Sequence, residues 1–285
     1  MIEYVKQARA ALSLLKPQAV RELAGRQVSF GLVASSEQGF AEMEQFLTGS
    51  FHPNGASDSG ALVYRAGDPH PPENVDFVLY EEGLIGPQGT YVYHWNDPER
   101  TIAEIVHAND DIAVPLARRY PVFRQSVVDR IIQLVSRENA LFAVATALPD
   151  VVPSMVELPW AFGEWASDTA FLTANQFRMA FQIAGCYGHE IGFLQQKGQI
   201  LAIAGGAFGW RAIARELAGK IPLGGGLIPK GAIAYAGTYA VGKALERWHQ
   251  SQTELPREER GKVYDMALER GRQLVGGLIP GKSQQ

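Results

Sequence analysis

The spacing of apolar residues changes near residue 100 of this 285-residue chain. Before that point, short apolar runs of strand length stand between turn-forming residues. After it, apolar residues recur at three- and four-residue intervals over long stretches. Runs of the first kind are typical of β-strands, and runs of the second kind are typical of amphipathic helices. The pattern therefore predicts a small α/β unit followed by an all-α helical domain.

The first part is predicted to combine strands and helices. Its elements, in order, are helices at 2–15 and 17–25, a strand at 28–33 with a loop and a helix after it, strands at 60–67, 74–80 and 89–95, and a helix that begins at Pro98. Either Asn96 or Asp97 is expected to cap that last helix, because a proline is favoured at the first helical position and Asn or Asp just before it.

The second part is predicted to be helical throughout. The expected helices cover 121–149, 166–188, 189–204, 207–219, 230–250 and 257–274. We place the boundary between the two domains so that residues 1–110 form the α/β unit and residues 111–285 the helical domain. No disordered linker separates them, so the two parts are expected to pack together.

Composition excludes several classes of protein. The net charge of −4 and the pI near 5.9 argue against a dedicated nucleic-acid binder. The single cysteine, Cys186, allows no internal disulfide, and the six histidines lack the spacing of a metal site. The longest charge-free apolar run, 198–210, is shorter than the roughly 18 residues that a membrane span needs. We therefore predict a cytoplasmic protein without metal or cofactor, with contact to the inner membrane surface left open.

The stretch VSFGLVASSEQGFAEMEQFL, residues 28–47, has the outline of a phosphate-binding loop. The nucleotide signature G-x-x-x-x-G-K-[ST] supplies a lysine for the terminal phosphate and a hydroxyl for Mg²⁺. Here Ala34 and Gly39 stand at the two glycine positions, Phe40 at the lysine position and Ala41 at the hydroxyl position. Glu37 adds a negative charge to the loop. The sequence thus predicts a Rossmann-like, P-loop-type remnant that does not bind nucleotide.

The segment LARRYPVFR places Arg118, Arg119 and Arg124 around the helix start at Pro121. Such a group could bind an anion or an acidic partner at a helix N-terminus. The favoured interpretation is that the arginines are solvated and pair with Asp110, Asp111 or Asp129. Cys186 and His189 lie three residues apart, and a buried structural cysteine is favoured over a catalytic pair.

Several polar residues interrupt otherwise apolar helices. Asp168, Asn175 and Gln176 lie on one predicted helix and Asn139 on another, so a hydrogen-bond network between helices is expected. Alanine recurs every four residues at Ala232, Ala236, Ala240 and Ala244. Such a stripe allows helices to approach closely, although an apolar face for a membrane or a partner is the other interpretation.

Three segments resemble a known family. They are the arginine-led helix at 116–149, DTAFLTANQFRMAFQIAGCYG, and the Gly/Ala-rich segment at 209–248. Together they look like the GTPase-associated bacterial domain of unknown function found in YcjF-like proteins. The recognisable points are Asn175 with Gln176, Tyr187 with Gly188, and the T-Y-A-x-G element at Thr238, Tyr239, Ala240 and Gly242. The resemblance implies a GTPase-like domain before the helical one, which matches the order of the two parts.

These observations lead to one preferred function. The chain is predicted to be a non-catalytic, GTPase-like adaptor or scaffold that binds a protein partner, either a true GTPase or a second copy of itself. A peripheral membrane protein is the alternative, and an active nucleotide hydrolase is the third. The interaction candidates are Arg118, Arg119, Arg124, Asp168, Asn175, Gln176, Lys230, Thr238 and Tyr239.

Overall fold

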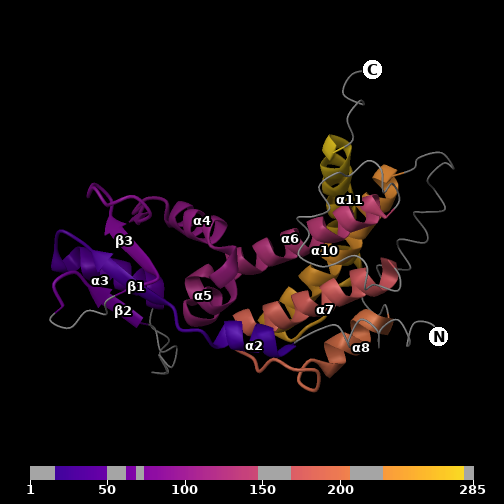
Figure 1. The fold of residues 1–285 in the computed structure, drawn as a ribbon, viewed down its shortest axis with the longest axis horizontal. Helices are drawn as coiled ribbons and strands as arrows, with labels where there is room; N and C mark the ends of the chain where they lie inside the picture. Colours follow the sequence, from indigo (N-terminus) through magenta and orange to yellow (C-terminus); the bar gives the residue numbers. More distant parts are fainter. Residues whose placement is uncertain (1–16, 50–61, 69–73, 147–167, 206–226, 279–285) are drawn as a thin grey trace. The chain divides into compact units, whose positions relative to one another are not determined.

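The computed structural model describes residues 17–49, 62–68, 74–146, 168–205 and 227–278 (Figure 1). By its contacts the chain forms two compact units. The sheet unit comprises Gln18–Arg130 and Ala184–Glu190, and the helical unit comprises Met1–Pro17, Ile131–Ile183 and Ile191–Gln285. The structure is mostly helical with one small sheet, in agreement with the predicted α/β plus helical organisation. The predicted helices at 2–15 and 207–219 lie outside the described residues.

The sheet has four parallel strands in the order β2-β1-β3-β4. They are β1 (Ser29–Val33), β2 (Leu62–Arg65), β3 (Phe77–Glu81) and β4 (Tyr91–Tyr93). Each lies within a predicted strand or overlaps it, and the observed strands are shorter because glycine and proline-rich turns flank them. In β1 the side chains of Phe30 and Leu32 are fully buried and alternate with half-buried neighbours, as the two-residue period of a strand requires.

Four helices belong to the sheet unit: α2 (Pro17–Gly25), α3 (Glu37–Thr48), α4 (Pro98–Ala108) and α5 (Ala113–Arg119). Asp97 caps α4 by accepting a hydrogen bond from the N–H of Arg100, and Pro98 follows it, so the predicted start of this helix is confirmed. The sequence assigned residues 111–130 to the helical domain. By their contacts these residues group with the sheet.

Tyr120 explains why this segment stays with the sheet. Its ring packs edge-on against Phe30 of β1, with 4.9 Å between centroids. Its fully buried hydroxyl lies 2.9 Å from the carbonyl of Val28 and 3.0 Å from that of Leu62, and it accepts from the N–H of Leu62. Burial raises the pKa of Tyr120 to about 12, so the hydroxyl keeps its proton and remains a donor. One side chain thus connects α5 to the first residues of two strands.

The helical unit is built from α6, α7, α8, α10 and α11, of which α6 and α7 also extend into the sheet unit. Their bounds are Arg124–Ala145, Asp168–Cys186, Lys197–Gly205, Leu227–Ser251 and Arg257–Leu278. The predicted helix at 189–204 was wrong in its first half: α8 begins at Lys197, because Gly188 at φ 80° ends α7 and turns occupy the residues between. Among the described helices, none combines the length and apolarity that crossing a membrane requires.

The alanine stripe of α10 is buried inside the helical unit. Ala232 and Ala236 are fully buried, and Ala240 and Ala244 are nearly so. Figure 1 shows α10 and α11 side by side, and their contact depends on Gly271 of α11. A Cβ on Gly271 would lie 2.9 Å from the Cα of Ala232 and 3.0 Å from its carbonyl oxygen. The small residues therefore serve close helix packing, as one of the two interpretations of the stripe held.

Two glycines of α11 provide a matched stability test. In Gly271→Ala the new methyl group meets the backbone of α10, which cannot rotate away, so we expect a loss of about 1–3 kcal/mol. In Gly261→Ala nothing lies within 4 Å, so we expect a gain of about 0.5–1 kcal/mol from the better helix former. Urea unfolding followed by circular dichroism measures both. Equal midpoints for the two variants would contradict the close contact.

Candidate functional site

The carboxyl ends of the parallel strands define one edge of the sheet. Ser35 and Ser36 follow β1 and lead into α3, Glu81 and Glu82 lie at the end of β3, and His94 follows β4. In open α/β sheets, ligands bind at this edge, next to the strands where the chain order reverses. In this sheet the reversal lies between β1 and β3, because β1 is flanked by β2 on one side and β3 on the other. This edge is therefore the first place to examine for a site.

The carboxylate of Glu81 occupies the loop that resembled a phosphate site. Its Oε2 atom accepts from the N–H of Ser35 at 2.6 Å and from the Ser35 hydroxyl at 2.7 Å. The backbone hydrogen bond, followed by the hydroxyl, lowers the pKa of Glu81 below its ordinary value of 4.5. A Cβ on Gly39 would lie 2.9 Å from Glu81 Oε1, so the absence of a side chain there leaves room for this carboxylate. The chain thus places one of its own carboxylates at this loop.

Two further N–H groups of the loop also have internal partners. The hydroxyl oxygen of Ser36 caps α3 by accepting from the N–H of Gly39 at 3.1 Å. The N–H of Phe40 donates to the carbonyl of Ser36, also at 3.1 Å. A phosphate loop depends on backbone N–H groups that point at the ligand and lack other acceptors. The Ser35, Gly39 and Phe40 donors are already used.

The lysine and hydroxyl positions offer no replacement for the missing groups. Ala41 is exposed, and the ring of Phe40 lies under the guanidinium of Arg65, 5.5 Å from its carbon to the ring centroid. Arg65 comes from the end of β2 and pairs with Glu37 at 2.9 Å and Glu44 at 2.8 Å. The hydrogen bond with Glu44 raises the pKa of Arg65. The nearby cation is therefore held by two carboxylates of α3, one of which is the loop residue Glu37.

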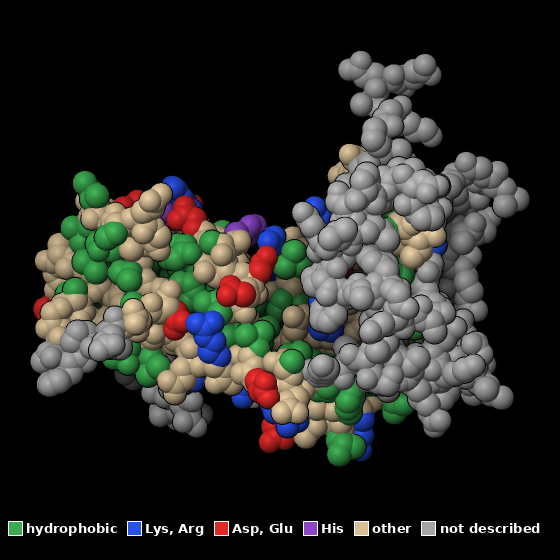
Figure 2. All heavy atoms as spheres, in the orientation of Figure 1, with side chains coloured by type: hydrophobic (Ala, Val, Ile, Leu, Met, Phe, Trp, Pro, Cys, Tyr) green, Lys and Arg blue, Asp and Glu red, His purple; other side chains and the backbone are tan. Residues whose placement is uncertain are grey.

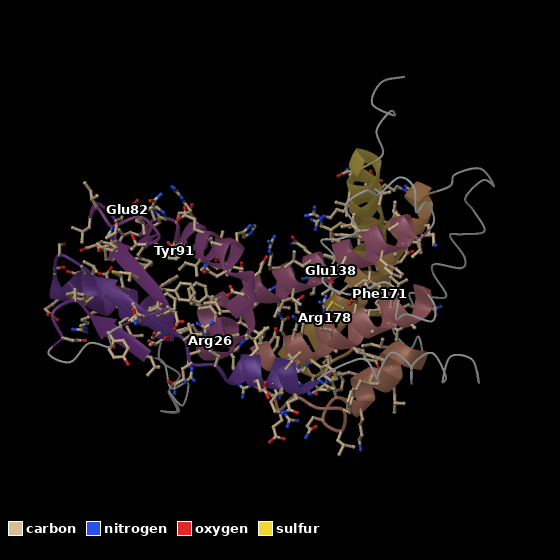
Figure 3. The ribbon with its side chains drawn as sticks, in the orientation of Figure 1. Arg26, Glu82, Tyr91, Glu138, Phe171 and Arg178 are labelled. Atoms are coloured by element: carbon tan, nitrogen blue, oxygen red, sulfur yellow. The ribbon has the colours of Figure 1, made fainter. Side chains whose placement is uncertain are left out.

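A histidine and two glutamates form a second cluster at the same edge. The Oε1 atom of Glu82 lies 3.3 Å from Nδ1 of His94, and its Oε2 atom accepts from the N–H of Trp95 at 3.3 Å. Nε2 of His94 lies 3.7 Å from Glu104 of α4. Figure 3 shows Glu82 just beyond β3. Within the described residues, no group of His, Cys, Asp and Glu side chains is arranged to hold a metal ion.

Two of the three arginines that the sequence singled out contact backbone carbonyls. Arg118 donates to the carbonyl of His189 at 3.1 Å, and Arg124 donates to that of Cys186 at 2.9 Å while its guanidinium lies over the ring of Tyr187. Asp110 pairs with Arg130. The predicted pairing of the three arginines with Asp110, Asp111 or Asp129 therefore stays a prediction for Asp111 and Asp129. Cations are favoured at the carboxyl end of a helix, because its last carbonyls lack partners. Arg118 and Arg124 thus stabilise the end of α7; Arg119 is half-buried on α5.

Cys186 is a structural residue. Its side chain is fully buried, and burial raises its pKa to about 12. A nucleophilic cysteine needs a thiolate near neutral pH. The preference for a buried structural cysteine over a catalytic Cys-His pair is therefore confirmed for this residue.

The predicted hydrogen-bond network between helices is present in the helical unit. Asn139 of α6 donates to Thr238 of α10 at 2.7 Å, and Asn175 of α7 donates to Asn139 at 2.8 Å. Gln176 of α7 lies 3.4 Å from the Thr238 hydroxyl, and its own Oε1 atom is buried without a hydrogen-bond partner. All four residues are buried. Three helices are therefore connected by polar groups that water does not reach.

The other candidates have separate surroundings. Lys230 is exposed, and its ammonium lies 3.2 Å from the Thr146 hydroxyl. Tyr239 is buried and stacks on Tyr235, with 6.0 Å between ring centroids. Asp168 begins α7, and its side chain lies outside the described residues. Near the network, Glu138 of α6 and Arg178 of α7 point toward one another and form an ion pair (Figure 3). The sequence candidates therefore do not form one site.

Sequence reasoning missed the acceptor role of Glu81 and the pairing of Glu82 with His94. Glu81 and Glu82 follow the strand predicted at 74–80, and His94 is one of the six histidines that lack the spacing of a metal site. A usable signal was present, because these residues follow predicted strands and the carboxyl ends of parallel strands meet at one edge. What the sequence lacked was the strand order, which decides that β3 lies beside β1.

The Glu81 contact should make stability depend on pH. The pKa of Glu81 is lower in the folded state than its ordinary value of 4.5. The stabilisation of the folded state by its carboxylate is therefore fully present above pH 4.5, and it is lost as the pH falls through the folded-state pKa. We expect Glu81→Gln to lower the thermal midpoint at pH 7, with the difference from wild type shrinking below pH 4.5. Glu42→Gln is the control. It removes the same charge from α3, but among the described residues Glu42 has only an exposed hydrogen bond from Gln38 within the same helix. Identical midpoints for wild type and Glu81→Gln at pH 7 would show that the contact contributes nothing.

Comparison of the chain with protein-family models, with curated proteins and with solved structures finds no match. The resemblance to the GTPase-associated family therefore stays a prediction.

Proposed function

We propose that this protein is a non-catalytic, GTPase-like adaptor or scaffold that binds a protein partner. The observation that carries the proposal is the hydrogen bonding of Glu81 to Ser35, because it places a carboxylate of the chain at the loop where a nucleotide would need free N–H donors. A phosphate approaching the loop would meet this negative charge as well as donors that are already used. The cytoplasmic location expected from composition suits such an adaptor.

The topology supports an origin from a nucleotide-binding fold. The parallel order β2-β1-β3-β4 is the start of the doubly wound order 2-1-3-4-5, in which a ligand binds between the first and third strands. The degenerate loop lies at that position. A Rossmann-like, P-loop-type remnant is therefore the interpretation that we propose for the sheet unit, with its binding position closed by Glu81.

The surface favours a protein partner over nucleic acid. On the face drawn in Figure 2, the basic and acidic side chains of the described residues are interspersed, and neither sign gathers into a patch. A nucleic-acid binder concentrates lysine and arginine on one face, because the phosphate backbone dominates its affinity. The net charge of −4 agrees with this reasoning.

The loop between β3 and β4 is the surface that we propose for the partner. Ile85 is 98% exposed at its centre. The loop around it is held in place: Leu84 donates to the carbonyl of Glu81, and the Thr90 hydroxyl donates to that of Pro87. Gly86 packs so closely against Tyr80 that a Cβ would lie 2.8 Å from its ring. An ordered loop therefore presents a large apolar side chain to solvent, next to the closed nucleotide position.

The closed loop leads to a direct binding prediction. We expect calorimetric titration of the full chain with GTP-Mg²⁺ and ATP-Mg²⁺ to give no heat of binding at micromolar nucleotide, because the loop lacks the lysine and hydroxyl and already holds Glu81. A competent phosphate-loop protein in the same buffer is the positive control. A dissociation constant in the micromolar range or tighter, corresponding to about −8 kcal/mol, would contradict the proposal.

The partner surface can be tested by affinity purification from the cells in which the protein is made. We expect the tagged wild-type chain to recover one partner in near-stoichiometric amount and Ile85→Asp to lose it, because a charge replaces an apolar contact. Gln88→Asp, exposed in the same loop, is the matched control and should keep the partner. Sedimentation velocity decides whether the partner is a second copy. Recovery that is equal for all three chains, or absent for wild type, would contradict the proposed surface.

Peripheral membrane contact is the second proposal, and one observation favours it. Phe193, Leu194 and Leu201 are large apolar residues exposed beside Lys197, in and just before α8. Anionic lipid attracts such basic residues by about 1 kcal/mol each. Against this, Lys243 is held by Glu246 at 2.6 Å, so its charge is compensated within the chain. The adaptor therefore stays the preferred function.

A further inference from the structure

The helical unit contains a cavity that neither the sheet edge nor the polar network uses. It has a volume of about 400 Å³ and lies among α8, the last turns of α10 and the first turn of α11. Sites for small molecules span roughly 300–1,000 Å³. The cavity exists because small residues line it: Gly198 and Ala202 lie one turn apart on α8, and a Cβ on Gly198 would meet nothing within 4 Å.

The floor and one wall of the cavity are apolar. Leu245 and Ala244 of α10 are buried to at least 97%, and Leu255 closes the lower end at 8% exposed. Trp248 forms a wall and keeps 40% of its surface exposed. Protein interiors are close-packed, and an apolar hollow of this size leaves its lining without contacts on one side. An apolar ligand body would supply those contacts.

One cation at the rim has no partner among the described residues. Arg260 lines the cavity and is half-buried, and within the described residues its guanidinium forms neither an ion pair nor a hydrogen bond. Elsewhere on α11, by contrast, Lys262 pairs with Glu258 and Arg272 with Glu269. A guanidinium always carries its charge and presents five donors that match a carboxylate. Arg260 is therefore positioned to hold an anion at the mouth of an apolar cavity.

Two further groups restrict the ligand. Glu254 also lines the rim and is exposed, so its charge would repel a dianion more strongly than a monoanion. The Oε1 atom of Gln199 is shielded from solvent and has no hydrogen-bond partner, although its Nε2 atom lies 3.1 Å from His249. This neutral amide adds no charge to the cavity lining, so Arg260 is the cation among the described residues that line the cavity.

We propose that this cavity binds a small molecule with an apolar body and a single carboxylate. The body packs on Leu245 and against the ring of Trp248, and the carboxylate accepts hydrogen bonds from Arg260. The proposal goes beyond the adaptor function, since every residue it uses lies between 195 and 260 and none belongs to the sheet edge. A fatty acid and a compact aromatic acid share this chemistry. We propose that the ligand is such an acid as a single dissolved molecule, and not as part of a membrane.

The test is a fluorescence titration of the full chain with decanoate below its micellar concentration, with decan-1-ol and decyl phosphate as companions. We expect saturable binding of decanoate. Decan-1-ol should bind about tenfold more weakly, because it loses the charge-assisted hydrogen bond to Arg260. Decyl phosphate should also bind about tenfold more weakly, because it brings a second negative charge. Arg260→Gln should weaken decanoate about tenfold and leave the alcohol unchanged. Arg257→Gln, one turn earlier on α11, is the matched control and should bind like wild type.

A second variant removes the cavity itself. The phenyl ring of Ala202→Phe fills the cavity from α8, so this variant should bind neither decanoate nor the alcohol. Circular dichroism checks that the variant is folded. If Ala202→Phe is not folded, Ala202→Leu is used in its place. Equal decanoate affinity in wild type and Arg260→Gln, or no saturable binding, would overturn the proposal. Flotation of the chain with anionic vesicles without binding of monomeric decanoate would overturn it too, in favour of the membrane surface. None of these results depends on whether Ile85 binds a protein.

Discussion

The hydrogen bonds from Ser35 to the carboxylate of Glu81 join the ends of β1 and β3 and fix the start of α3. They also decide what this edge of the sheet can do. At the switch point of a parallel sheet, backbone donors need an acceptor, and in many proteins of this architecture a ligand provides it. Here the acceptor belongs to the chain. The same interaction therefore supplies the loop with both an acceptor and a negative charge.

The same constraint organises the rest of the protein. Polar groups shielded from water must find partners within the chain, and leaving one unpaired costs about 1–3 kcal/mol. The Tyr120 hydroxyl forms such hydrogen bonds with backbone groups at the start of β1 and β2. The Asn139 side chain of α6 forms them with side chains of α7 and α10. Arg124 donates to the carbonyl of Cys186, the last residue of α7, and Arg118 donates to that of His189 just beyond it. These contacts specify which elements meet, since an apolar surface alone would tolerate many arrangements.

Packing of small residues has opposite consequences at the two ends of α10. Near its start, Gly231 and Ala232 allow α11 to approach so closely that a Cβ on Gly271 would meet backbone atoms. Near its end, Ala244 lines a cavity together with Gly198 and Ala202 of α8, and Arg260 at its rim has no partner among the described residues. Small side chains exclude space only where the backbones approach closely, and elsewhere they leave a hollow.

The sequence by itself determined the type and order of most described elements, because long runs of three- and four-residue spacing and strand-length apolar runs are local signals. It also indicated that the loop at 34–41 lacks the groups that a nucleotide needs, since Phe40 and Ala41 can be read without a fold. The helix start at Lys197 and the grouping of residues 111–130 escaped it. Only the tertiary structure decided that Glu81 lies beside Ser35, that Arg65 lies over Phe40, and that Arg260 lies at the rim of a cavity. Each of these contacts joins residues that are distant in sequence or come from different elements, so strand order and helix packing, which single-sequence patterns do not encode, determine them.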